Sequence, residues 1–153
     1  YTNAGGGFVG LLPGACFFDH ADAFGMIRGG HIDVTVLGGL QVSEKGDLAN
    51  WQFPGRDAGN IGGGMDLAAG AKRVIVAMEH NTRSGEPKIV RQCTYPLTAK
   101  ECVDLIVTDL AVIEVTEQGL LLREVAPGFS ADEVQAVTEP RLIVAKDLKE
   151  IEL

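Results

Sequence analysis

Short runs of β-branched and aliphatic residues alternate along this chain with short segments that carry helix-capping residues. The run VIVAME (residues 74–79) is almost continuously apolar, as in a strand that is buried on both faces of a parallel sheet. Strands that alternate with helices are typical of an α/β protein. We therefore predict an α/β fold with an open, mostly parallel sheet, flanking helices and an antiparallel hairpin at one edge.

The predicted elements rest on turn residues and on capping patterns. Asp19 can cap a helix that Gly29-Gly30 would end, and Thr98 with Glu101 and Ser130 with Glu133 have the capping-box spacing. The predicted strands lie at 8–18 (ending in the turn at Pro13-Gly14), 31–42, 74–79 and 141–144, with an extended segment at 48–55. The predicted helices lie at 20–30, 65–73, 98–110 and 130–139. A turn is predicted at 43–47, a loop at 80–88, and a hairpin at 111–126 that turns at 117–119.

Size and charge limit the class of protein. The length of 153 residues, 46% of them apolar, fits a single domain over residues 1–153 with its own core. A net charge of −8 argues against nonspecific nucleic-acid binding and against docking on anionic membranes. No apolar run reaches the roughly 18 residues of a membrane span, and no signal peptide is visible.

The cysteines and histidines form no pattern that binds a metal. Cys16, Cys93 and Cys102 are odd in number and widely spaced, so we predict reduced, mostly buried thiols and a cytoplasmic location. His20 and His31 have no partner at metal-ligand spacing, and no metal site is predicted.

Two glycine-rich segments are candidate ligand loops. GGGFVG (5–10) matches G-x-G-x-x-G, but the strand before it and the helix after it are missing, so dinucleotide binding is not favoured. GNIGGGMD (59–66) follows an extended segment and precedes a predicted helix. Its backbone N–H groups would suit a phosphate, a carboxylate or a thioester oxyanion, while a purely structural loop is the alternative.

A few polar residues have both a functional and a structural interpretation. Glu79 and His80 end the predicted strand at 74–79, where general acid–base chemistry or a hydrogen-bonded structural pair are both open. Arg28 could face a cleft or pair with Asp22 or Asp33. Trp51 is the one tryptophan, and core or interface packing is its expected role.

Several ordered motifs together resemble the B (β) subunit of 3-oxoacid CoA-transferases, the family of succinyl-CoA:3-ketoacid and 3-oxoadipate CoA-transferases. The resemblance runs from about Asn3 to the C-terminus. Its most specific elements are MIRGGHID (26–33), GDLANW (46–51) and GGGMDL (62–67). It implies the open α/β CoA-transferase (NagB/RpiA-like) fold and a pairing of A and B parts, with the active site between them.

The resemblance also implies a reaction. CoA moves from an acyl-CoA such as succinyl-CoA to a 3-oxo acid, acetoacetate or 3-oxoadipate. A glutamate of the B part attacks the thioester, and an acyl-glutamyl anhydride and then a glutamyl-CoA thioester follow. No cofactor is implied beyond the coenzyme A thioester that serves as substrate. The implied partners are an A-type chain and the two substrates in an oligomer, with no nucleic acid and no membrane.

By position, the resemblance assigns the oxyanion N–H to Gly63, and we place Asn60, Gly62 and Gly64 beside the substrate or CoA. Gly64 stands where the family has alanine, and Gly6 stands where the family often has a lysine. The nucleophilic glutamate belongs to a Ser-Glu-Asn-Gly element that precedes the match to Asn3. No glutamate of this chain fits it, so we expect that the chain lacks an N-terminal segment before Tyr1 and is inactive alone.

Two other functions stay open at this point. The chain could be a non-catalytic domain that keeps the fold and the surface for an A-type chain. A weaker alternative is a stand-alone nucleotide binder, which would bind NAD(H) or ATP rather than CoA.

Overall fold

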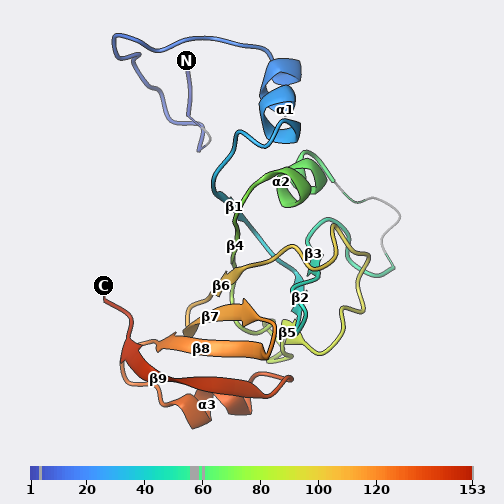
Figure 1. The fold of residues 1–153 in the computed structure, drawn as a ribbon, viewed down its shortest axis with the longest axis vertical. Coiled ribbons are helices and arrows are strands. Elements are labelled where there is room, and N and C mark those ends of the chain that lie inside the picture. The colour runs from blue at the N-terminus through green and yellow to red at the C-terminus, as the bar shows by residue number, and fades with distance from the viewer. Residues whose placement is uncertain (4, 56–58, 60, 153) are drawn as a thin grey trace.

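The computed structural model describes residues 1–3, 5–55, 59 and 61–152 (Figure 1). The helices are interspersed among runs of consecutive strands, and the strands of the main sheet pair mostly in parallel, so the predicted α/β class is confirmed. In chain order the elements are α1 (His20–Arg28), β1 (Thr35–Leu37), β2 (Gln41–Ser43), β3 (Leu48–Ala49), α2 (Gly64–Gly70), β4 (Val74–Ala77), β5 (Ile89–Val90), β6 (Leu105–Val107), β7 (Ala111–Thr116), β8 (Gly119–Val125), α3 (Ala131–Ala136) and β9 (Leu142–Glu150).

The main sheet has the strand order β1-β4-β6-β7-β8-β9. Strand β4 pairs in parallel with both β1 and β6, and β8 pairs in parallel with β9. The β7–β8 hairpin is antiparallel to β6 and lies inside the sheet, because β9 continues the sheet beyond it. The sheet is thus mostly parallel, as predicted, but the hairpin is not its edge.

A second, three-stranded sheet has the order β3-β2-β5. Strand β2 is antiparallel to β3 and parallel to β5. The chain reaches this sheet from β1 through Gly38-Gly39. The predicted single strand over 31–42 is therefore wrong in its extent, because the two glycines divide it into β1 and β2.

The core lies between these two sheets and α3. It is made of aliphatic side chains from the strands, with Val134 of α3 packed against them. The fully buried members include Val42, Leu48, Val76, Ile89, Ile106, Ile113, Leu120 and Leu122. Burial on this scale is the main source of stability in a domain of this size.

Strand β4 is buried less completely than its sequence predicts. Val74 and Val76 are buried, but Ile75 is only half-buried and Ala77 is exposed. One face of β4 therefore contacts the core and the other is covered only in part.

The capping patterns at the first and last helices are confirmed. Asp19 accepts a hydrogen bond from the Asp22 N–H and begins α1, and Gly29 ends it. Ser130 and Glu133 form a reciprocal capping box at α3. The hydroxyl and backbone N–H of Ser130 hold the pKa of the Glu133 carboxyl below its usual value.

The predicted helix over 98–110 is wrong. The Thr98 N–H donates to the Leu48 carbonyl, and the Thr98 hydroxyl is bonded to Asn50 rather than to the backbone of a following turn. Glu101 has a positive φ of 47°, and Leu105–Val107 forms β6 between β4 and β7. Pairing with neighbouring strands therefore overrides the local capping signal.

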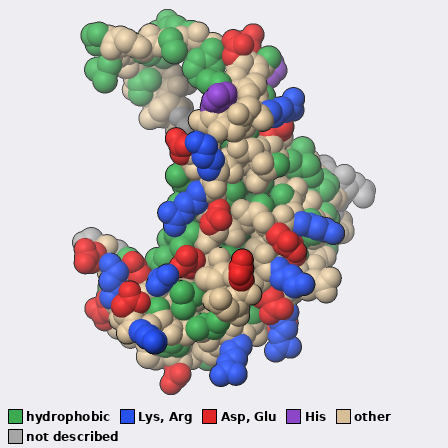
Figure 2. Space-filling view, in the orientation of Figure 1, with side chains coloured by type: hydrophobic (Ala, Val, Ile, Leu, Met, Phe, Trp, Pro, Cys, Tyr) green, Lys and Arg blue, Asp and Glu red, His purple; other side chains and the backbone are tan. Residues whose placement is uncertain are grey.

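The predicted buried strand over 8–18 is also wrong. Among the described residues this segment pairs only through a single bridge between Thr2 and Phe8, and its large apolar side chains are exposed, with Phe8 94% and Leu12 82% exposed. It extends away from the sheets together with α1 (Figure 1), and hydrophobic side chains gather over it in Figure 2.

No helix in the described residues is long and apolar enough to cross a membrane.

Candidate functional site

The candidate site lies at the edge of the main sheet that is formed by the carboxyl ends of β1 and β4. In α/β proteins, ligand-binding groups gather at this edge. After β1 the chain turns at Gly38-Gly39. A Cβ on Gly39 would fall 2.7 Å from Val76 Cγ1 and 2.8 Å from Met78 Sδ. A glycine is therefore required for the chain to pass over the end of β4 toward the small sheet.

Asn50 ties three segments together at this edge. Its side-chain N–H donates to the Gly38 carbonyl (3.1 Å), and its backbone N–H donates to Thr98 Oγ1 (3.1 Å). The Thr98 hydroxyl in turn donates to Asn50 Oδ1 (2.6 Å). Sequence reasoning did not single out Asn50, although it lies in the quoted motif GDLANW.

The glycine run 62–64 leads from this edge into α2. Gly62 has φ +48°, a left-handed conformation that favours glycine. Gly63 is the N-cap of α2 with φ −90° and ψ 8°, and the Gly64 N–H donates to the Ile61 carbonyl (3.1 Å). The predicted residue Asn60 lies outside the described residues.

The three glycines have different structural reasons to be glycine. Gly62 needs its backbone conformation. A Cβ on Gly63 would fall 2.8 Å from Cζ of the Phe24 ring, so a side chain there would have to displace this half-buried ring. A Cβ on Gly64 would lie 3.6 Å from Asn50 Oδ1, an ordinary contact, so an alanine fits there. Phe24, which sequence reasoning missed, thus borders the predicted oxyanion residue.

Arg28 pairs with a residue other than the two expected from sequence. Its Nε donates to Asp66 Oδ1 of α2 (2.7 Å), while Asp33 pairs with Lys72 (2.6 Å). The Asp66 carboxylate raises the pKa of the Arg28 guanidinium through the hydrogen bond and its charge. The prediction of a pair with Asp22 or Asp33 is wrong, because α2 lies alongside α1 and offers a partner that is distant in sequence.

His80 has a structural role. It is buried, its Nδ1 lies 2.9 Å from Thr108 Oγ1, and its Nε2 lies 2.8 Å from Thr138 Oγ1. Burial lowers the pKa of the imidazole below its usual value, and the charge of Asp109 opposes this only in part. With both ring nitrogens engaged by threonine hydroxyls, His80 is not placed for proton transfer to a ligand. Glu79 is exposed.

The remaining sequence candidates lie apart from the glycine loop or have structural contacts. Burial raises the pKa of the Cys93 thiol to about 12 and that of Cys102 to about 11, so neither is a thiolate at neutral pH. Cys16 is exposed, which contradicts the expectation that it is buried. The Trp51 indole N–H donates to the Leu97 carbonyl (3.2 Å). The described residues contain no cluster of His, Cys, Asp and Glu that could hold a metal ion.

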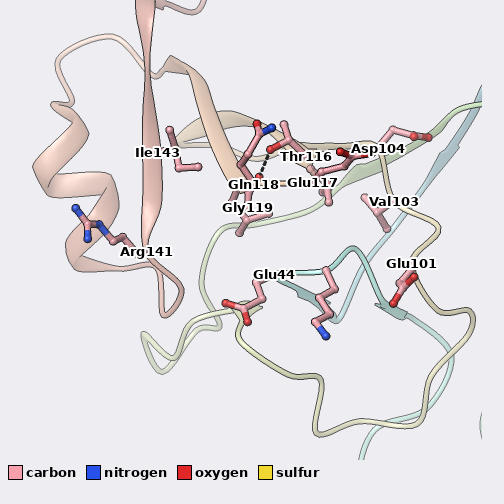
Figure 3. A pocket seen from close by; sticks show the side chains of 13 residues that line it. Glu44, Glu101, Val103, Asp104, Thr116, Glu117, Gln118, Gly119, Arg141 and Ile143 are labelled. Carbon is pink, nitrogen blue, oxygen red and sulfur yellow. Dashed lines mark hydrogen bonds between the residues drawn. The ribbon is translucent and has the colours of Figure 1, made fainter.

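A hollow of the described surface lies at the opposite edge of the sheet. It has a volume of about 830 Å³ and is lined by the 44–45 turn, the segment before β6, the β7–β8 turn, and Arg141 and Ile143 (Figure 3). Its charged groups are mostly acidic and include Glu44, Glu101 and Glu117. The predicted site glycines 62–64 do not line it, so this hollow is not the predicted oxyanion site.

Comparison with known proteins identifies the family. The family model for Coenzyme A transferase matches residues 1–136. This chain belongs to the coenzyme A transferase family. It is 51% identical to the β subunit of acetate CoA-transferase from Escherichia coli over 96% of its length, and 51% identical to the B subunit of 3-oxoadipate CoA-transferase from Acinetobacter baylyi over 94%. The resemblance stated from the motifs is therefore confirmed.

This CoA-transferase chain spans only part of its relatives. It covers 68% of the Escherichia coli protein and 66% of the Acinetobacter protein, and 29% of the mitochondrial succinyl-CoA:3-ketoacid coenzyme A transferase 2B of Mus musculus, to which it is 50% identical. The two bacterial relatives are B-type or β-type subunits, and this chain corresponds to that type of polypeptide.

The fold agrees with that of a solved CoA-transferase. The crystal structure of the acyl-CoA transferase YdiF from Escherichia coli O157:H7 superposes with a TM-score of 0.80 over 94% of this chain, which covers 33% of that protein, at 22% sequence identity. The predicted CoA-transferase fold is confirmed.

Proposed function

We propose that this chain forms part of a CoA-transferase that moves CoA from an acyl-CoA such as succinyl-CoA to a 3-oxo acid. The observation that carries the proposal is the 51% identity to B-type subunits over almost the whole chain. The relatives differ in the acid in their names, acetate in one and 3-oxoadipate in another, so identity alone favours no acceptor. Acetoacetate and 3-oxoadipate are the acceptors that we propose to test.

In this proposal the Gly63 N–H is one donor to the oxyanion of the tetrahedral intermediates, and a donor from an A-type chain completes the pair. The Gly64 N–H is already bonded to Ile61, which leaves Gly63 as the better candidate. Helix α2 has only seven residues, so the role rests on the N–H itself rather than on a helix dipole. A single oxyanion donor contributes roughly 10²–10³ in kcat in other enzymes.

Gly62, Gly64 and Asn60 surround this donor in the sequence and are proposed to border the substrate or CoA. Coenzyme A enters as the thioester substrate, and no other cofactor is proposed. Asn50 supports the assignment of this edge, because its hydrogen bonds to Gly38 and Thr98 fix the segments on which the glycine loop rests.

The attacking carboxylate is proposed to come from outside residues 1–153. Glu44 and Glu101 line the groove at the opposite edge of the sheet, so neither can reach the glycine loop. Glu79 follows β4, but it is exposed and its charge acts on the Lys88 ammonium.

The test uses the full B-type protein that contains this chain, assembled with its A-type partner. We expect transfer of CoA from succinyl-CoA to acetoacetate or 3-oxoadipate, measured by the absorbance of the 3-oxoacyl-CoA. Mass spectrometry of the enzyme with acyl-CoA and no acceptor should find CoA on a glutamate outside residues 1–153. An adduct on Glu44, Glu79 or Glu101, or no transfer to any carboxylic acid, contradicts the proposal.

A partner polypeptide is proposed for the first 18 residues. Tyr1, Phe8, Leu12 and Phe17 are mostly exposed, and exposed apolar patches often mark protein–protein contacts. We expect residues 1–153 to bind the A-type chain without catalysing transfer, and to form dimers when that chain is absent. Light scattering that shows a well-folded monomer, or CoA transfer by residues 1–153 with the A-type chain, contradicts this part.

A further inference from the structure

Helix α1 has no buried residue, and among the described elements it contacts α2 most extensively. Two side chains make this contact at the N-terminal end of α2. The Phe24 ring lies against Gly63 so closely that a Cβ would be 2.8 Å from its edge. Arg28 bonds Asp66 one turn later, and its guanidinium lies 5.6 Å from the centroid of the same Phe24 ring. The ring is therefore held between the Gly63 backbone and the Arg28 cation.

The other end of α2 is in equally close contact with α1. A Cβ on Gly70 would overlap the Ile27 carbonyl. Gly63 and Gly70 are seven residues apart, which is about two turns, so they lie on the same face of α2. Glycines on one face let the backbones of two helices approach directly. A displacement of α1 must then move the N-terminal turn of α2.

The conformation of Gly63 does not itself demand glycine. Its φ of −90° and ψ of 8° are accessible to alanine. The approach of the Phe24 ring is the feature that disfavours a side chain there, because the ring would have to move. The local structure at Gly63 is thus tied to a side chain that lies 39 positions earlier in the chain.

We propose that Phe24 and Arg28 are positioning residues that fix the direction of the Gly63 N–H. Phe24 sets where the Gly63 peptide lies, and the Arg28–Asp66 pair keeps the ring and α2 in register. The inference rests on the proposed function for its effect on catalysis. Neither side chain needs to touch the substrate, and a shift of about 1 Å in a catalytic donor can cost on the order of 10²-fold in rate.

The test compares Phe24→Ala and Phe24→Leu with Phe129→Ala in the full B-type protein assembled with its A-type partner. Phe129 is an exposed phenylalanine two residues before α3, a helix that lies far from α2 (Figure 1). We expect Phe24→Ala to lower kcat by about 10- to 100-fold while KM for the acyl-CoA changes less than about 2-fold. Phe24→Leu should restore part of kcat, and Phe129→Ala should keep the wild-type value.

A second arm tests the ion pair and the glycine. Arg28→Ala should lower kcat, and the exchanged pair Arg28→Asp with Asp66→Arg should recover part of it. Gly63→Ala should lower kcat through the clash with the ring, whereas Gly63→Ala added to Phe24→Ala should cause little further loss, because the clash is gone. Additive losses in this double variant contradict the inference.

An NMR measurement gives a readout besides activity. The ¹H–¹⁵N signal of Gly63 should shift, and its amide exchange should accelerate, in Phe24→Ala but not in Phe129→Ala. If the wild-type assembly transfers no CoA, the proposed function fails whatever Phe24 does. If the wild type is active and Phe24→Ala keeps its kcat and its Gly63 signal, the positioning inference alone is overturned.

Discussion

Residues 1–34 and the strands β6 to β9 are both rich in apolar side chains, but these side chains are exposed in the first region and largely buried in the second. In β6–β8 these side chains largely alternate between buried and half-buried positions, and Ile106, Ile113 and Leu122 are fully buried. None of the described side chains in the first 34 residues is buried, and α1 is held chiefly by α2. Figure 1 shows the same contrast, since the N-terminal segment and α1 extend away from the packed sheet.

The difference indicates which part of the chain is stable by itself. The β6–β9 region satisfies its own backbone through neighbouring strands and covers its inner face with α3. The N-terminal region has polar contacts to the rest through the Arg28–Asp66 and Asp33–Lys72 pairs, and its apolar side chains are exposed. The proposed catalytic loop lies between the two regions.

The largest expected effect separates the two regions by stability. Leu122→Ala should lower the free energy of unfolding by about 2–5 kcal/mol, because it removes buried methyl groups and leaves a cavity. Leu12→Ala, at a leucine that is 82% exposed, should change it by less than about 0.5 kcal/mol. Urea denaturation followed by circular dichroism measures both. Equal losses would show that the N-terminal segment packs on the body in solution.

The next effect is a pH dependence that belongs to His80. Burial lowers the pKa of His80 in the folded chain below the 6.5 of an unfolded histidine, so the unfolded chain binds more protons below that pH. Stability should be independent of this group above about pH 6.5 and should fall as the pH is lowered through 6.5, with a slope of at most about 1.4 kcal/mol per pH unit.

The control for this slope is another histidine. His80→Gln should be less stable at pH 7.5, because the hydroxyls of Thr108 and Thr138 lose their hydrogen bonds to the imidazole, but its stability should fall less between pH 7 and pH 5.5. His20→Gln, at an exposed residue, should keep the wild-type slope. An unchanged slope in His80→Gln means that His80 does not carry the effect.

The smallest expected changes in stability lie in the glycine loop, where they distinguish Gly62 from Gly64. Gly62→Ala should cost about 1–2 kcal/mol, because φ is +48°. Gly64→Ala should be neutral or stabilise the chain by up to about 1 kcal/mol, because the added methyl group has room and alanine favours a helix. Thermal unfolding of the two variants side by side tests this order, and a larger loss for Gly64→Ala would refute it.

Local patterns predicted the elements whose cause is local. The Asp19 cap with Gly29, the Ser130–Glu133 capping box and the β7–β8 turn were all predicted in type and approximate extent, because adjacent backbone groups and side chains make these structures. The family motifs also located the glycine loop, although the residue that borders Gly63 lies on another helix.

The wrong secondary-structure predictions occur where contacts with segments distant in sequence determine the local conformation. Thr98 and Glu101 have the spacing of a capping box, but the Thr98 N–H is taken by the Leu48 carbonyl and the Glu101 N–H by Asp47 Oδ1. The apolar run at 8–18 has the composition of a buried strand but finds no neighbouring strand among the described residues, so its side chains stay exposed.

The amino-acid sequence by itself determined the family, the α/β class and the capped helices, because these follow from short-range hydrogen bonding and from ordered motifs. The tertiary structure decided the pairing of Arg28 with Asp66, the burial of His80 between two threonines and the approach of Phe24 to Gly63. The hydrogen-bonded residues are 28 to 58 positions apart in the chain, and Phe24 and Gly63 are 39 positions apart. Their geometry depends on how helices and strands pack, which no local pattern specifies.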